Sequence, residues 1–245
     1  MKKTKHSVAL AAVTVALLSS LLVGRGDAQA PPTPDQMVAA LKQSLAESQK
    51  RLRQYEWIET TAISLKGEEK SRKQQRVYYG ADGKLTKLPM GEPQPQAAQG
   101  GRGGRGGRLK QQIVENKKDE MQDYMERAGN LIHLYVPPSP EQIQKAKDAG
   151  NMLVRPPQAG KVRVEFPGFI QPSDLFAIDV DAKALLLSAI SVATYLEKKE
   201  DAVTLNVQFG ALTDGTSYTA KTTLEAKAKN ITVVIENAGH RPLAR

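Results

Sequence analysis

Two stretches near the carboxyl end of the chain alternate apolar and polar residues with a period of two. Residues 203–209 run Val-Thr-Leu-Asn-Val-Gln-Phe, and residues 218–226 run Tyr-Thr-Ala-Lys-Thr-Thr-Leu-Glu-Ala. Because successive side chains of a strand point to opposite faces, this pattern predicts strands with one dry face and one wet face. Such sheets are usually antiparallel, and the dry face needs cover from other elements. This requirement constrains the fold of the whole chain.

Further segments have strand character, and most of the connections between them are short. Asp82-Gly83 and Asp214-Gly215 are typical of hairpin turns, and we expect a type I′ turn at Asp82-Gly83, with positive φ at both central residues. About nine strands are expected. The second is a very polar strand that follows the turn at Gly67 and runs through Lys73 to Tyr79. The others are expected at 57–65, 84–88, 161–166, 175–180, 184–196, 202–212, 218–226 and 231–237.

Three segments have helical character. Apolar residues recur at helical spacing from Pro34 to about Gln54 and from about Asn116 to Tyr135. A third helix is expected over residues 139–150, and capping boxes are expected at Thr33 and Ser139. Together these elements predict an α+β fold: a curved antiparallel sheet, or half-barrel, covered by the N-terminal helix and a helical insertion.

Residues 1–30 have the three parts of a secretory signal peptide. A basic start is followed by an apolar run over residues 8–23 and by Ala28-Gln29-Ala30, a small-x-small cleavage pattern. The alternative is an uncleaved membrane anchor, but an apolar run of about 16 residues is short for a bilayer span. We therefore expect a periplasmic or secreted bacterial protein with no transmembrane segment after cleavage.

Residues 31–245 are expected to form a single α+β domain with a disordered loop at 89–108. The loop is rich in Pro, Gln and Gly and contains an Arg-Gly-Gly repeat. In a nuclear or cytosolic protein such a repeat would suggest RNA, but here it is short, lacks aromatic residues and follows an export signal. Removing the signal lowers the formal net charge from +9 to +6. We expect no nucleic-acid partner.

The sequence offers little catalytic chemistry. It has no Cys, and neither His133 nor His240, which lies after the last expected strand, has a second ligand at metal-binding spacing. Nucleophile-elbow, zinc-protease and phosphate-loop motifs are absent, so no cofactor, metal or catalytic residue is expected. Carboxylates remain as candidates for a hydrolase: Glu56, Glu59, Asp174, Asp179 and Asp181.

The order helix, strands, helical insertion, strands resembles the periplasmic lipoprotein-carrier group (LolA/LolB-like), over most of Pro34–Asn237. In that group an incomplete β-barrel covered by helices shields lipid acyl chains, and the resemblance implies the same arrangement here. The segments 55–60 and 212–218 are similar to those of uncharacterised exported bacterial proteins. This chain departs from the group in its Gly-Arg loop and in its very polar second strand.

The first functional hypothesis is an exported, non-catalytic protein that binds an apolar or lipid-like ligand in a half-barrel cavity. The cavity candidates are Trp57, Ile63, Val203, Leu205, Val207 and Phe209. The alternative is an envelope scaffold or sensor module that binds another protein through the open sheet edge or the basic strand around Lys70–Arg76. A carboxylate-dependent hydrolase is the remote alternative.

The signal peptide gives a first testable prediction. Cleavage after Ala30 should yield a mature protein that begins at Pro31, because the basic, apolar and small-residue regions occur in the required order. N-terminal sequencing of the exported protein measures this directly. Recovery of intact Met1 from the mature envelope fraction would contradict the assignment.

Overall fold

The computed structural model describes residues 34–91 and 105–243, with side chains from residue 43 onward and, after the gap, from residue 119 onward. The signal peptide and most of the loop expected at 89–108 lie outside this range. The elements are α1 (Pro34–Leu52), β1 (Tyr55–Leu65), β2 (Glu68–Tyr79), β3 (Leu85–Met90), α2 (Arg105–His133), α3 (Pro140–Asp148), β4 (Leu153–Val154), β5 (Lys161–Pro167), β6 (Leu175–Asp181), β7 (Leu187–Tyr195), β8 (Ala202–Ala211), β9 (Ser217–Ala226), the short helix η1 (Lys227–Lys229) and β10 (Ile231–Pro242).

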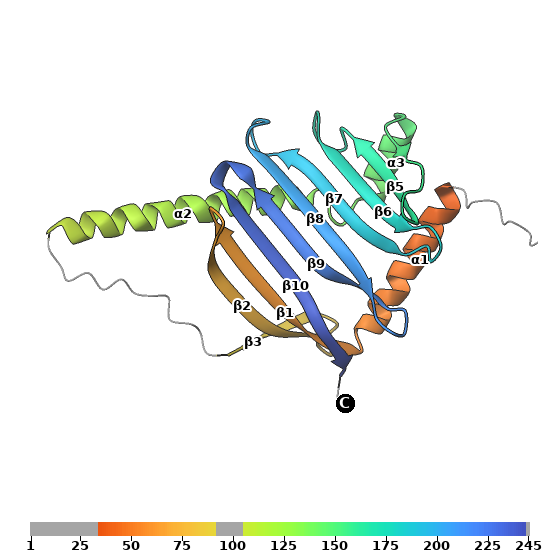
Figure 1. Cartoon of the computed structure of the whole chain (residues 1–245), viewed down its shortest axis with the longest axis horizontal. Helices are drawn as coiled ribbons and strands as arrows, with labels where there is room; N and C mark the ends of the chain where they lie inside the picture. Colours follow the sequence, from red (N-terminus) through yellow and green to blue (C-terminus); the bar gives the residue numbers. More distant parts are fainter. Residues whose placement is uncertain (1–33, 92–104, 244–245) are drawn as a thin grey trace, which may run out of the picture. The chain divides into compact units, whose positions relative to one another are not determined.

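The strands form one open antiparallel sheet, in the order β3-β2-β1-β10-β9-β8-β7-β6-β5-β4. The last strand therefore lies between the first strand and β9, and it joins the two strand groups that the helical insertion separates in the sequence (Figure 1). All neighbouring strands pair in antiparallel fashion. The expected α+β class and curved antiparallel sheet are confirmed.

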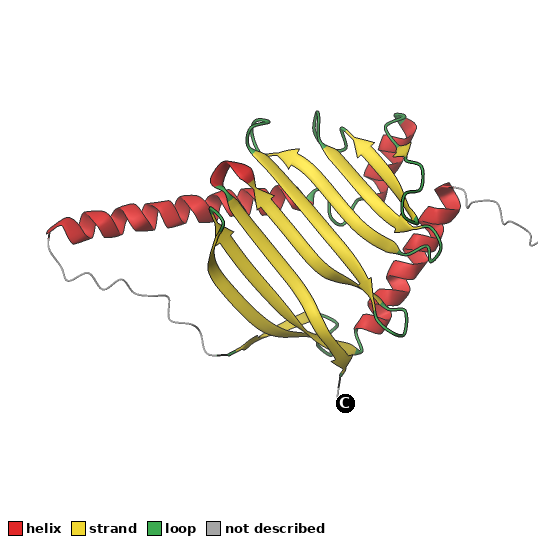
Figure 2. Cartoon of the chain, in the orientation of Figure 1, coloured by secondary structure: helices red, strands yellow, loops and turns green. Residues whose placement is uncertain are grey.

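All three helices lie on one face of the sheet, behind it in the view of Figure 2. The main core forms where the end of α2 and α3 meet strands β5 to β8, and Ala128, Ile132 and Ala146 are its buried helical members. We call this helix-covered side the inner face. It is the dry face that the alternation of residues 203–209 predicts, since Val203, Leu205 and Val207 are all buried on it.

The outer face is polar. Asn206 and Gln208 of β8 are exposed between the buried residues of the same strand. Ion pairs bridge neighbouring strands there: Lys221 of β9 lies 2.8 Å from Glu236 of β10. These contacts are solvent-exposed and add little stability, but they keep the outer face soluble.

A buried carboxylate holds the helical insertion against the sheet. Tyr135, just after α2, donates its hydroxyl hydrogen bond to Asp174 at 2.5 Å, and the same hydroxyl lies 2.8 Å from Thr194 Oγ1 on β7. Asp174 also accepts the backbone N–H groups of Phe169, Ile170 and Gln171. Because Asp174 is 2% exposed, these donors replace the water that a charged group needs.

The Asp-Gly turns occur where the sequence predicts them, but the expected type I′ geometry is wrong. Gly83 and Gly215 have φ of 75° and 79°, whereas Asp82 and Asp214 do not have positive φ. In each turn the Gly N–H bonds to the carbonyl oxygen three residues earlier, at Gly80 and Leu212. This is a turn followed by a left-handed glycine, and it needs positive φ at one residue only.

Several expected boundaries shift. α2 begins at Arg105 instead of about Asn116, because residues 108–113 contain good helix formers without Gly or Pro. The tenth strand, β4, was not expected, and β10 continues to Pro242 instead of ending at Asn237. Ser139 occupies the N-cap position of α3, but its side chain makes no capping hydrogen bond, so the capping box expected there is wrong.

The Tyr135 contact yields a stability prediction. Replacing Tyr135 by Phe should lower the free energy of unfolding by about 1–3 kcal/mol, because Asp174 loses one of its donors in a buried site. Chemical denaturation of the mature protein measures the change. The control is Tyr195→Phe, whose hydroxyl donates to the Pro172 carbonyl at an exposed site and should cost about 0.5 kcal/mol or less. Equal losses would mean that the buried Tyr135 hydroxyl contributes no more to stability than the exposed Tyr195 hydroxyl.

Candidate ligand-binding face

The six candidate residues fall into two groups on the sheet. Val203, Leu205, Val207 and Phe209 come from β8, and the other two, at positions 57 and 63, come from β1. Strands β10 and β9 separate β1 from β8, so the structure does not bring the six into one site. Strand register instead links two of them, Ile63 and Leu205, through a row of side chains that crosses the sheet.

One such row is apolar across seven strands. Starting at β1, each member is the register partner of the next: Ile63, Val233, Leu224, Leu205, Val192, Phe176 and Phe166. Register partners in an antiparallel sheet point to the same face, so the whole row lies on the inner face. A parallel row runs beside it, from Thr61 through Ile235, Thr222 and Val207 to Ile190.

Burial changes sharply along these rows. On β8, Val203, Leu205 and Val207 are 0%, 5% and 6% exposed, whereas Ile63 on β1 is 38% exposed. The residues between them, on β9 and β10, are only partly buried. We call this less covered part of the rows the open strip: Thr61, Ile63, Thr222, Leu224, Val233 and Ile235.

Helix α2 borders the open strip. Met121 and Met125 pack beside Val233 against a small cluster formed by Tyr124, Ala226 and Ile231. Unbranched methionine side chains adapt to different neighbours, so they suit the edge of a variable contact.

Polar contacts fix this part of α2 to the strand ends. The Tyr124 hydroxyl donates to Asp201, and burial followed by this hydrogen bond raises the pKa of Tyr124. Arg127 lies 2.7 Å from Glu197, in an exposed pair.

Aromatic side chains fill the inner face at the other end of β1. Trp57 stacks on His240 with ring centroids 5.6 Å apart, and His240 also contacts Tyr218. The indole N–H of Trp57 donates to Asn237 at 3.0 Å. Burial lowers the pKa of His240, so its neutral form is favoured. His240 thus belongs to β10 and not to a tail after the last strand, as its position in the sequence suggested.

The carboxylates do not gather in one place. Glu59 lies on the inner face and accepts both hydrogen bonds of Lys87, at 2.6 and 2.8 Å. Asp179 pairs with Arg163, and Asp181 accepts N–H groups of its own turn. Glu56 pairs with Arg241. In the described ranges, no three His, Asp or Glu side chains are grouped closely enough to hold a metal ion.

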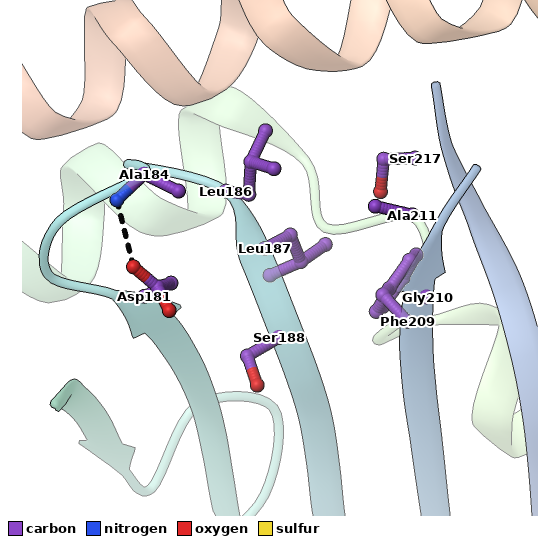
Figure 3. A pocket seen from close by; sticks show the side chains of 9 residues that line it. All are labelled: Asp181, Ala184, Leu186, Leu187, Ser188, Phe209, Gly210, Ala211 and Ser217. Atoms are coloured by element: carbon purple, nitrogen blue, oxygen red, sulfur yellow. Dashed lines mark hydrogen bonds between the residues drawn. The ribbon is translucent and has the colours of Figure 1, made fainter. Parts of the chain in front are cut away.

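A small hollow lies between β7 and β8, close to α1 (Figure 3). It holds about 150 Å³, and Leu186, Leu187 and Phe209 are among its lining residues. A second hollow of about 150 Å³ lies beside Glu56 and Arg241. Pockets for drug-sized ligands measure about 300–1,000 Å³, so neither hollow is large enough for an acyl chain to be enclosed.

No family profile matches the chain, and no curated protein matches it. Among solved structures, it is similar to a LolA superfamily protein from Nitrosomonas europaea, at 8% identity and a TM-score of 0.36, covering 84% of this chain and 94% of that one. A DUF1329 family protein from Desulfovibrio piger has 11% identity and a TM-score of 0.34, covering 83% and 93%.

A third structure, MucB in complex with MucA(peri), has 11% identity and a TM-score of 0.20, covering 84% and 99%. The first of the three carries the family name that the element order of the sequence resembles. With identities and scores this low, the likeness carries no conclusion about the ligand or partner of this chain.

Sequence reasoning identified the dry face but not its uneven cover. Val233 and Ile235 were visible only as part of a strand, and Met121 and Met125 only as part of a helical stripe. Alternation shows which face a residue occupies, but not which helix reaches it. The register between β1 and β10, strands about 170 residues apart, was the missing information.

The uneven cover predicts different costs for two truncations on β8. Leu205→Ala should lower the free energy of unfolding by about 2–5 kcal/mol, because it empties a packed site under the helices. Phe209→Ala should cost less than the ~3–5 kcal/mol usual for a buried Phe, because Phe209 is only partly buried and borders the hollow. Urea unfolding of both variants tests this. A larger loss for Phe209→Ala would show that the hollow closes in solution.

Proposed function

We propose that this chain is an exported, non-catalytic envelope protein that binds an apolar, lipid-like ligand along the open strip. The observation that carries the proposal is the continuous apolar row that loses its cover between β8 and β1. Exposed apolar surface that continues a core is costly in water, and it commonly marks a binding site.

The proposed binding site is an open surface, whereas the sequence suggested an enclosed cavity. Under α2 and α3, the inner face is filled by protein side chains such as Ile132 and Tyr135. Over the open strip no comparable layer is present among the described residues, since Ile63 remains 38% exposed. A bound chain would therefore lie on the strip beside α2, with Met121 and Met125 along its flank.

The export signal and the polar outer face support an envelope location. Within the described residues, no helix combines the length and the apolar character needed to cross a membrane. An exported protein with such a less covered apolar strip gains stability from a ligand that binds only the folded state.

A second candidate function, an envelope scaffold that binds a protein partner, is supported by the sheet edges. Five exposed large apolar residues lie on the two edge strands: Leu85, Leu88 and Met90 on β3, and Leu153 and Val154 on β4. Edge strands with such side chains accept an added strand unless something blocks pairing. Pro89 provides a partial block on β3, because it lacks an N–H group.

Binding of the neutral apolar probe N-phenylnaphthylamine to the mature protein tests the lipid-ligand proposal. Probe fluorescence should rise on mixing, and a long-chain fatty acid should reverse it. Ile63→Asn should weaken probe binding about tenfold, because it places an amide at the exposed β1 end of the strip. Val234→Asn on the outer face of β10 is the matched control and should leave binding unchanged.

Both variants must retain the parent's melting transition for the comparison to hold. If the folded parent protein raises no fluorescence, the lipid-ligand proposal fails and the edge-strand candidate remains. If both variants lose binding equally, the probe does not lie on the inner face.

A further inference from the structure

The two rows of the open strip continue onto β2, where they become polar. Ser71 is the register partner of Ile63, and Lys73 is the partner of Thr61. Gln75 follows as the partner of Glu59. Alternate strand residues share a face, so Ser71, Lys73 and Gln75 all lie on the inner face, at one end of the apolar rows.

Lys73 differs from the other basic residues of β2. Lys70 pairs with Glu68, Arg72 with Glu69 and Arg76 with Glu56. Among the described residues, no ion pair or hydrogen bond engages the exposed side chain of Lys73.

Register also separates these basic residues by face. Arg72 and Arg76 are opposite Ala62 and Ile58, so they lie on the outer face. Lys70 lies at a register shift and is paired with Glu68, so Lys73 is the unpaired cation that β2 contributes to the inner face.

Its nearest charged neighbours on the inner face neutralise each other. Glu59 on β1 binds Lys87 on β3 through both carboxylate oxygens. Among the described residues, this leaves the charge of Lys73 without a partner on this part of the inner face. A single uncompensated cation beside an apolar strip matches a ligand with one negative charge and an apolar chain.

From these observations we infer that the ligand is a long-chain carboxylate, with its head group at Lys73 and its chain across β1, β10 and β9. The inference rests on the proposed function and adds the ligand's charge and direction. Ser71 and Gln75, which make no side-chain hydrogen bond to another described residue, flank the lysine and can donate to the carboxylate. The path from β2 to β9 spans three strand spacings, about 14 Å.

A carboxylate is favoured over a phosphate monoester by the charge count. A phosphate group carries roughly −1.5 to −2 at neutral pH and is usually held by arginine or by several cations. The arginines of β2 lie on the other face and are already paired. One lysine with two neutral donors balances a monovalent head group.

The test compares decanoate, decanol and decyl phosphate as competitors of N-phenylnaphthylamine on the mature protein. Decanoate should bind about two- to fivefold more tightly than decanol at low salt, which is within the range for one exposed charge pair. Lys73→Gln should abolish this preference without changing decanol binding. Lys73→Arg should keep it, and added salt should reduce it in the parent protein.

Arg72→Gln is the matched control, since it removes a cation from the adjacent position on the outer face and should leave the preference intact. The fluorescence of Trp57, the only tryptophan, gives a second signal from the same face. Lys73 is exposed, so its substitution should not alter the melting temperature.

The outcomes separate this inference from the proposed function. If decanoate and decanol bind equally, or if Arg72→Gln removes the preference as Lys73→Gln does, the lysine assignment fails while lipid binding stands. If decyl phosphate binds more tightly than decanoate through Lys73, the carboxylate assignment fails. If no competitor displaces the probe, the proposed function fails and the inference falls with it.

Discussion

One buried carboxylate holds the end of α2 against the sheet. Asp174 lies in the connection between β5 and β6 and brings together three backbone N–H groups and the hydroxyl of Tyr135. Through that hydroxyl, the end of α2 is held above β7, and its last turns fill the inner face over β5 to β8. A charge buried this deeply tolerates little displacement, because every donor that moves away leaves desolvation uncompensated. The contact therefore helps to keep the end of α2 over β5 to β8.

The resulting division gives the two halves of one sheet different physical characters. Over β5 to β8, the apolar residues have helical partners, and Val203 and Leu205 belong to a packed core. Over β9, β10 and β1, the same rows continue with less cover. The less covered half is thus a continuation of the packed core and not a separate domain. In the proposed function, the packed half would fix the backbone, and the less covered half would supply the contact surface.

The sequence predicts much of this fold and only part of the candidate site. Alternation over residues 203–209 correctly places Val203, Leu205 and Val207 on the dry face, and helical spacing locates α1 within two residues of its observed end. The geometry of the Asp82-Gly83 turn was not predictable, because two turn types share a left-handed Gly and differ in the preceding residue. The extension of β10 past Gly239 was hidden by a bulge, and the uneven cover depends on a contact between residues 39 apart in the chain.

The position of β10 between β1 and β9 also has a consequence for the order of folding. Strands β1 to β3 can pair with one another early, but their link to the rest of the sheet requires the last strand, as in the bond between Trp57 and Asn237, 180 residues apart. Closing so long a loop is entropically costly, and sheets dominated by distant pairings form slowly. The chain therefore cannot complete its sheet until its C-terminal segment is free to insert. If the chain is exported as residues 1–30 predict, such a delay would keep it unfolded until it has crossed the membrane.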